Sequence, residues 1–170
     1  MRIIVSVFAI LTSVTVAFSQ SLSDLDKNPS FKGIAIGSPI SKYSSILKYR
    51  NTSDGMTVYT ITDKQYYSLF NITVDNAAVI AKDGVVNAVY LRKSFPESRN
   101  DLSELKLLES IAFGLKSKYG GYNVDHTNTS KTPAIFGMGW MARNVMIQIG
   151  FIDEEIPILE YTLSKRDDDY

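Results

Sequence analysis

The single histidine of the chain, His126, is the first candidate for acid–base chemistry, and there is no cysteine. A catalytic serine or threonine needs a base within hydrogen-bond reach and a third group that orients this base. His126 lies between Asp125 and Thr127 in a polar stretch, and no Gly-x-Ser-x-Gly motif occurs. We therefore interpret His126 as a surface loop residue. The composition excludes disulfides, thiolate nucleophiles, zinc ribbons and multi-histidine metal sites.

The acidic residues favour turns over paired-carboxylate catalysis. Asp63, Asp75 and Asp83 each follow a predicted strand, where aspartate is favoured for backbone reasons. The segment from Gly33 to Gly37 lacks the lysine of a phosphate-binding loop. The sequence thus predicts no catalytic residue, no cofactor and no metal.

Aromatic residues are the better candidates for contact with a partner. The chain has 10 tyrosines and one tryptophan, and exposed tyrosine and tryptophan are favoured anchors in interfaces. Tyr122 and Trp140 flank the irregular segment that contains His126. These three residues are the predicted partner-binding site, with the alternative that Trp140 caps the core.

The N-terminus has the pattern of a secretory signal peptide over residues 1–19. Arg2 precedes an apolar run from Ile3 to Phe18, and Ala17 and Ser19 are small residues before a cleavage site. A transmembrane anchor is the alternative, but it needs about 20 apolar residues. We therefore expect a periplasmic or secreted protein without a transmembrane segment after cleavage. The net charge of +0 argues against a nucleic-acid partner.

Hydrophobic spacing and turn residues predict the elements of the mature chain. Residues 20–30 are expected to be a flexible N-terminus, and 167–170 an acidic tail. The elements between them are a short strand at 31–36, a helix from Ser38-Pro39 to Tyr49, strands at 56–62, 66–74, 77–82 and 85–93, a helix at 101–119, and strands at 134–140, 143–152 and 158–165.

Several local patterns carry these predictions. Asp83-Gly84 is a strong signal for a two-residue type I′ hairpin turn. Strict alternation places Val145, Ile147, Ile149 and Phe151 on one face of a strand, and Leu159, Tyr161 and Leu163 inward on the next.

The order β-α-β-β-β-β-α-β-β-β predicts a single α+β domain at 31–166. Runs of strands between single helices favour an antiparallel sheet, here of about six to eight strands, with two helices packed on one face. Several strands are apolar on both faces. This favours a homodimer or a curled sheet.

Short motifs along the chain resemble a loose group of small secreted bacterial α+β domains. They are Phe31-x-Gly33-Ile34-x-x-Gly37, the turn at Lys82-Asp83-Gly84-Val85-Val86, a helix that ends Lys118-Tyr119-Gly120, a strand around Trp140, and Leu159-Glu160-Tyr161. The helix-then-antiparallel-sheet units of these domains are similar to those of the beta-lactamase inhibitor protein and of small outer-membrane assembly lipoproteins. The chain departs from the lipoproteins because it lacks their lipid-bearing cysteine. The resemblance implies a non-enzymatic interaction module.

The sequence therefore favours an exported, non-catalytic binding module whose partner is a protein or a cell-envelope component. The alternative is a small hydrolase or small-ligand-binding protein that uses carboxylates and tyrosines on the sheet face. This alternative predicts that Asp125, His126 and a strand carboxylate converge in one pocket. A third hypothesis is a structural protein that self-associates through an exposed strand edge.

Overall fold

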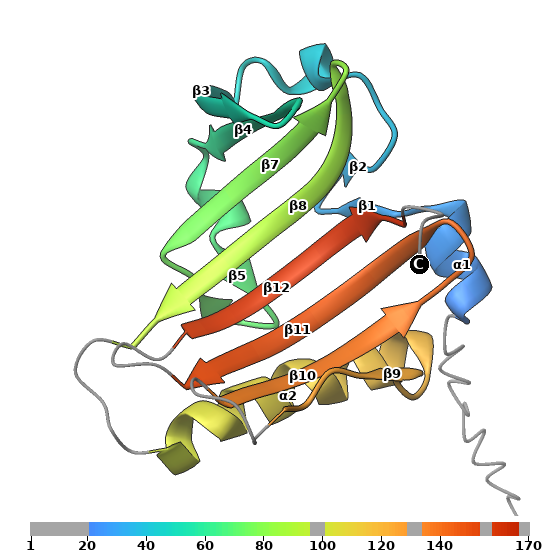
Figure 1. Cartoon of the computed structure of the whole chain (residues 1–170), viewed down its shortest axis with the longest axis vertical. Coiled ribbons are helices and arrows are strands. Elements are labelled where there is room, and N and C mark those ends of the chain that lie inside the picture. Colours follow the sequence, from blue (N-terminus) through green and yellow to red (C-terminus); the bar gives the residue numbers. More distant parts are fainter. Residues whose placement is uncertain (1–20, 96–100, 129–133, 154–157, 167–170) are drawn as a thin grey trace, which may run out of the picture.

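A large antiparallel sheet dominates the computed structural model, which describes residues 21–95, 101–128, 134–153 and 158–166. Its eight strands follow the order β3-β4-β7-β8-β12-β11-β10-β9 (Figure 1). They are β3 (Leu47–Ser53), β4 (Met56–Ile61), β7 (Asn76–Lys82), β8 (Val85–Ser94), β9 (Val124–Asp125), β10 (Ala134–Met141), β11 (Val145–Asp153) and β12 (Ile158–Lys165). The predicted α+β class with an antiparallel sheet is confirmed.

Aspartate–glycine turns set the register of two of the hairpins. Asp83 and Gly84 both have positive φ, at 52° and 74°, and join β7 to β8 as predicted. Asp54 and Gly55, at 51° and 74°, join β3 to β4 in the same way. The Asp54-Gly55 turn explains why the helix predicted just before it does not form.

The predicted helix from Ser38 to Tyr49 is wrong. This segment forms a short 3-10 helix, η1 (Ile40–Tyr43), and the first residues of β3. Serine is only a moderate helix former, and Ser41, Ser44 and Ser45 all fall within the predicted helix. The Asp54-Gly55 turn instead pairs the residues from Leu47 onward with β4, so they join the sheet.

The edge strand β3 is almost wholly exposed. It carries Lys48 and Arg50, and its pairing with β4 shifts register between Tyr49 and Asn51. Charged side chains and bulges are features that hinder pairing between sheet edges. This edge is therefore poorly suited to the self-association considered above.

Two small hairpins lie outside the main sheet. The first joins β1 (Ser30–Phe31) to β2 (Ile34–Ala35), and the second joins β5 (Ser68–Leu69) to β6 (Ile72–Thr73). The predicted strand at 66–74 is therefore wrong, because a 3-10 helix, η2 (Lys64–Tyr66), and a turn at Phe70-Asn71 interrupt it. Asparagine tolerates positive φ, but phenylalanine rarely adopts it, so the sequence signal for this turn was weak.

Two α-helices accompany the sheet. The long helix α2 (Asp101–Tyr119) is confirmed, and it ends before Gly120, which has a φ of 86°. The short helix α1 (Leu22–Lys27) lies where we expected a flexible N-terminus. Its Leu25 is buried, and the carboxylate of Asp26 accepts hydrogen bonds from the backbone N–H groups of Arg143 and Asn144 at 2.9 and 2.8 Å. These contacts fix α1 to the β10–β11 turn.

One face of the sheet carries the core. The inward positions predicted for β11 and β12 are all buried, and they pack with Leu108, Ile111 and Leu115 of α2. The ring of Phe31 in β1 lies 5.8 Å from that of Tyr161 in β12, so the β1–β2 hairpin covers the same face. Trp140 is fully buried there, and its indole N–H donates to the carbonyl of Gly120 at 2.8 Å.

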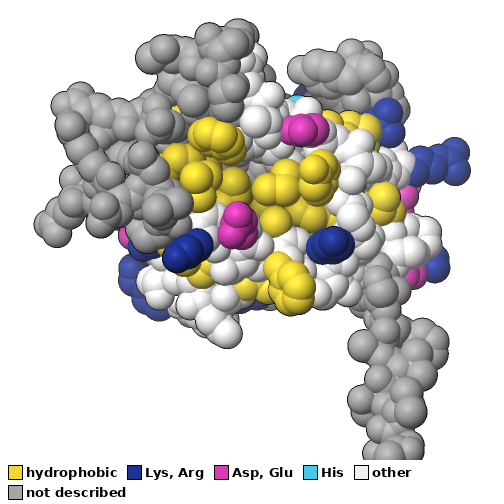
Figure 2. Space-filling model, turned by 90° about the horizontal axis from the view of Figure 1, so that it is seen from below, with side chains coloured by type: hydrophobic (Ala, Val, Ile, Leu, Met, Phe, Trp, Pro, Cys, Tyr) yellow, Lys and Arg dark blue, Asp and Glu magenta, His cyan; other side chains and the backbone are white. Residues whose placement is uncertain are grey.

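The outward side of α2 is not purely polar. Phe113 is 72% exposed, and apolar side chains gather between isolated charged ones in the view from below (Figure 2). The amphipathic pattern of this helix is therefore weaker than its buried stripe alone indicates.

Within the described residues, no helix is long and apolar enough to cross a membrane. The predicted signal peptide at 1–19 and the predicted acidic tail at 167–170 lie outside the described residues.

Candidate functional site

The sheet face opposite the core is open over strands β8, β10, β11 and β12. In Figure 1 this outer face is turned toward the viewer, and α2 lies behind β10. Because side chains alternate along a strand, the buried positions of β11 and β12 leave Gln148 and Gly150, and Glu160, Thr162 and Ser164, on the outer face. The same alternation places Met146 and Ile152 of β11 there, so the open face presents both polar and apolar side chains.

Glycines make this face hollow beside β9. A Cβ on Gly137 would lie 3.0 Å from the Cβ of His126, and one on Gly139 would lie 3.3 Å from the Cβ of Val124. His126 also donates its backbone N–H to the carbonyl of Gly137 at 2.9 Å. The absence of side chains at these two positions lets His126 lie against the strand.

Two neighbouring hollows share His126 and Gln148 and form what we call the outer groove. The larger has a volume of about 480 Å³, and the smaller about 160 Å³. The larger is lined by His126, Met141, Met146, Gln148, Ser164, Lys165 and Arg166, and the smaller by His126, Gly137, Gln148, Ile149, Gly150, Ile152, Glu160 and Thr162. The groove therefore follows β11 and β12.

A tyrosine–carboxylate pair stands at one end of the groove. The Tyr90 hydroxyl donates a hydrogen bond to Oε1 of Glu160. Burial, and then this hydrogen bond and the charge of Glu160, raise the pKa of Tyr90 above its usual range, while the charge of Arg92 opposes the rise. Tyr90 thus stays protonated and holds the carboxylate in place. Arg92 lies directly opposite Glu160 across the strand pair and offsets its charge.

At the centre of the groove, His126 contacts an amide. Its Nε2 lies 3.1 Å from Nε2 of Gln148. Asp125 does not join this cluster, because its carboxylate accepts the backbone N–H of Thr127 at 2.8 Å. That hydrogen bond is also the main reason why the pKa of Asp125 is lowered. His126 and Glu160 thus line one hollow, while Asp125 does not.

The predicted partner-binding residues fall into different environments. His126 lines the outer groove. Tyr122 is 51% exposed, but its ring packs edge-on against Trp140 at 6.3 Å, on the core side of β10. Trp140 itself has no exposed surface. The structure therefore brings Tyr122 and Trp140 together and places His126 on the opposite face.

The other residues of the outer groove were not identified from the sequence. The strand predictions identified the buried faces of β11 and β12 correctly, so the opposite register already contained Gln148, Gly150, Glu160 and Thr162. Their polar character was the available signal. Gly137 and Gly139 lie within the strand expected at 134–140, and nothing near them in the sequence indicates that His126 and Val124 occupy the space beside them.

The outer groove offers hydrogen-bonding and charged groups rather than a metal centre. No group of three metal-ligating side chains gathers among the residues that the structure describes. Comparison with known proteins found no matching family model, no matching curated protein and no matching solved structure. The resemblance to small secreted α+β domains remains a prediction.

Two tyrosines make the stability of the protein sensitive to alkaline pH. Burial raises the pKa of Tyr161, as burial and Glu160 do for Tyr90. Above pH ~10 an unfolded tyrosine loses its proton, whereas the folded protein retains both. We therefore expect the free energy of unfolding to fall as the pH rises above 10.

Urea denaturation of the protein between pH 9 and 11 measures this fall. In Tyr90→Phe and in Tyr161→Phe, the free energy of unfolding should fall less steeply with pH than in the wild type. Equal slopes in all three proteins would contradict the account.

Proposed function

We propose that the protein is an exported, non-catalytic binding module that holds an extended, acidic segment of a partner protein in the outer groove. The observation that carries the proposal is the basic and apolar character of the larger hollow. Met141 and Met146 line it together with Lys165 and Arg166, and none of the carboxylates that the structure describes lines it. The export signal predicted at 1–19 supports a partner in the periplasm or outside the cell.

The dimensions of the groove fit a short extended segment. Outer-face positions on β11 run from Met146 to Ile152, which spans about 20 Å at ~3.4 Å per residue. A peptide of about six residues has this length when extended. The interior strands already pair their backbone groups, so recognition would rely on side chains.

Charge and side-chain chemistry determine what the segment should contain. Lys165 is exposed and has no ion-pair partner among the described residues. It would attract an aspartate or glutamate of the partner. The two methionines are flexible and accept apolar side chains of varied shape. At the other end, Glu160 and Thr162 would accept hydrogen bonds from polar groups.

The geometry at His126 favours binding over catalysis. In a nucleophilic site the histidine would contact a serine or threonine hydroxyl and a group that orients the ring. Here the ring nitrogen contacts the Gln148 amide. The alternative, a small hydrolase or small-ligand-binding protein, is supported by the Tyr90–Glu160 pair and by the hollow that His126 shares with Glu160.

Selection from a random hexapeptide library displayed on phage tests the proposal. We expect the wild-type protein to enrich peptides that combine aspartate or glutamate with a large apolar residue. For the tightest of these peptides, Lys165→Glu should weaken binding at least tenfold (about 1.4 kcal/mol), because it places like charges together.

Lys116→Glu is the matched control. It makes the same change of charge at an exposed position of α2, away from the groove, and should leave the affinity unchanged. Selected peptides without an acidic bias, or equal weakening by both variants, would overturn the proposal.

A further inference from the structure

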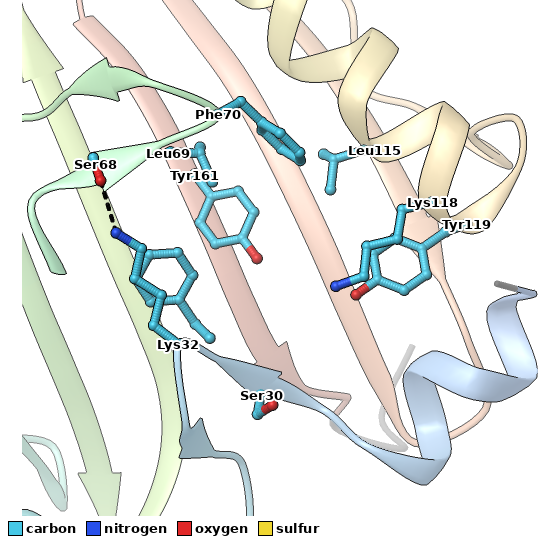
Figure 3. A pocket seen from close by; sticks show the side chains of 10 residues that line it. Ser30, Lys32, Ser68, Leu69, Phe70, Leu115, Lys118, Tyr119 and Tyr161 are labelled. Carbon is cyan, nitrogen blue, oxygen red and sulfur yellow. Dashed lines mark hydrogen bonds between the residues drawn. The ribbon is translucent and has the colours of Figure 1, made fainter. Parts of the chain in front are cut away.

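A second cavity lies on the core side of the sheet (Figure 3), on the opposite face from the outer groove. It has a volume of about 200 Å³, is open to solvent on one side, and is lined by residues of α2, β12 and the two small hairpins. Its lining consists of Ser30, Phe31, Lys32, Ser68, Leu69, Phe70, Leu115, Lys118, Tyr119 and Tyr161. A cavity of about 150 Å³ accommodates a benzene ring, so this one has room for a ring with a small substituent.

Two buried tyrosines line this cavity, and their hydroxyls have no partner within the described part of the chain. Tyr161 is 5% exposed and Tyr119 is 8% exposed. Neither hydroxyl makes a hydrogen bond to any residue that the structure describes, and that of Tyr161 points into the cavity (Figure 3). Leaving a buried hydroxyl without a partner is costly, so such groups call for an explanation. A bound acceptor would supply one.

Positive charge borders the same space. The Lys32 ammonium donates to the carbonyl of Gln65 at 2.5 Å and to the hydroxyl of Ser68 at 2.7 Å, which leaves its third proton for another acceptor. The Lys118 ammonium lies 5.0 Å from the centre of the Tyr119 ring. Among the residues that the structure describes, no aspartate or glutamate lines the cavity. Its electrostatic character therefore favours an anion.

Two hairpin turns with positive φ position part of the cavity wall. Lys32 and Phe70 both adopt a φ of 47°, in the left-handed region that bulky residues avoid. Gly114 of α2 makes room for the Phe70 ring, since a Cβ there would lie 2.6 Å from two of its carbon atoms. Lys32 and Phe70 each stand first in a two-residue hairpin turn, as Asp54 and Asp83 do, and the turn geometry fixes where their side chains lie. Here both residues face one cavity.

We propose that this cavity binds a small organic carboxylate with an apolar body of about one aromatic ring. The carboxylate accepts hydrogen bonds from the Tyr161 hydroxyl and the Lys118 ammonium, while Lys32 adds positive charge on the opposite side of the cavity (Figure 3). The ring packs between Phe31, Phe70 and Leu115. The site is independent of the outer groove and of the partner proposed there.

Fluorine NMR of the protein with 4-fluorobenzoate tests this proposal. We expect saturable binding of 4-fluorobenzoate, with 4-fluorobenzyl alcohol at least tenfold weaker because it lacks the charge. Lys118→Met and Tyr161→Phe should each weaken 4-fluorobenzoate at least fivefold. The second variant keeps the buried ring, so its fold should be retained.

Two controls locate the site. Lys116→Met removes a charge from the exposed surface of the same helix, and Lys165→Glu alters the outer groove. Neither should change the affinity for 4-fluorobenzoate. Absence of binding, equal binding of the alcohol, or full affinity in Tyr161→Phe would overturn the proposal. Loss of binding in Lys165→Glu would also overturn it, because the ligand would then occupy the groove.

Discussion

Replacing Trp140 with alanine should lower the free energy of unfolding by about 3–5 kcal/mol, which is the usual loss for a buried tryptophan. Trp140 is fully buried, and its indole N–H donates to the carbonyl of Gly120, just beyond the end of α2. The variant therefore loses both a large core side chain and the link between β10 and that end of the helix. Since whole domains are stable by only about 5–15 kcal/mol, this loss removes a large share of the total stability.

Urea denaturation followed by circular dichroism measures this loss. Trp140→Phe is the matched control because it keeps an aromatic ring and removes the N–H donor. Its loss should be clearly smaller than that of the alanine variant. A loss below about 1 kcal/mol in Trp140→Ala would mean that the tryptophan does not support the core as described.

Replacing Asp26 with alanine should have the second largest effect on the free energy of unfolding. Its two carboxylate oxygens accept backbone N–H groups from Arg143 and Asn144 at 2.9 and 2.8 Å. Hydrogen bonds to charged groups are the stronger ones, so we expect Asp26→Ala to cost about 1.5–3 kcal/mol. Hydrogen exchange should also show faster opening of the β10–β11 turn, because this carboxylate fixes α1 to it.

Asp24 in the same helix provides the comparison. Its carboxylate binds only near neighbours in the chain, namely Ser21 and Lys27. Asp24→Ala should therefore destabilise the protein less than Asp26→Ala and leave exchange in the distant turn unchanged. Equal effects of both variants would show that the contact across the fold contributes little.

Local patterns predicted most of the sheet and missed what depends on distant contacts. The Asp83-Gly84 hairpin and the alternation in β11 and β12 involve neighbouring residues, and both predictions are confirmed. Helix α1 has only 6 residues, too few to be stable alone, and it is held by Asp26 across the fold. Nothing close to it in the sequence indicated that contact.

The candidate site was predicted only in part for a similar reason. His126 was singled out, but its neighbours Gln148 and Glu160 come from strands that reach it through sheet order. Trp140 was a candidate contact, yet the register of β10 turns it into the core. The face that a strand residue occupies depends on which side of the sheet is covered, and sequence spacing alone does not specify this.

The most direct test of the outer groove is to locate a bound segment on the protein. Two-dimensional ¹⁵N NMR of the protein, titrated with the acidic hexapeptide selected as above, would do this, since the amides of Gly137 and Gly150 report on the groove. We predict that the shift changes concentrate at these glycines and along β11 and β12. Changes confined to α2 or to the β3–β4 hairpin would contradict the assignment of the outer groove as the binding site.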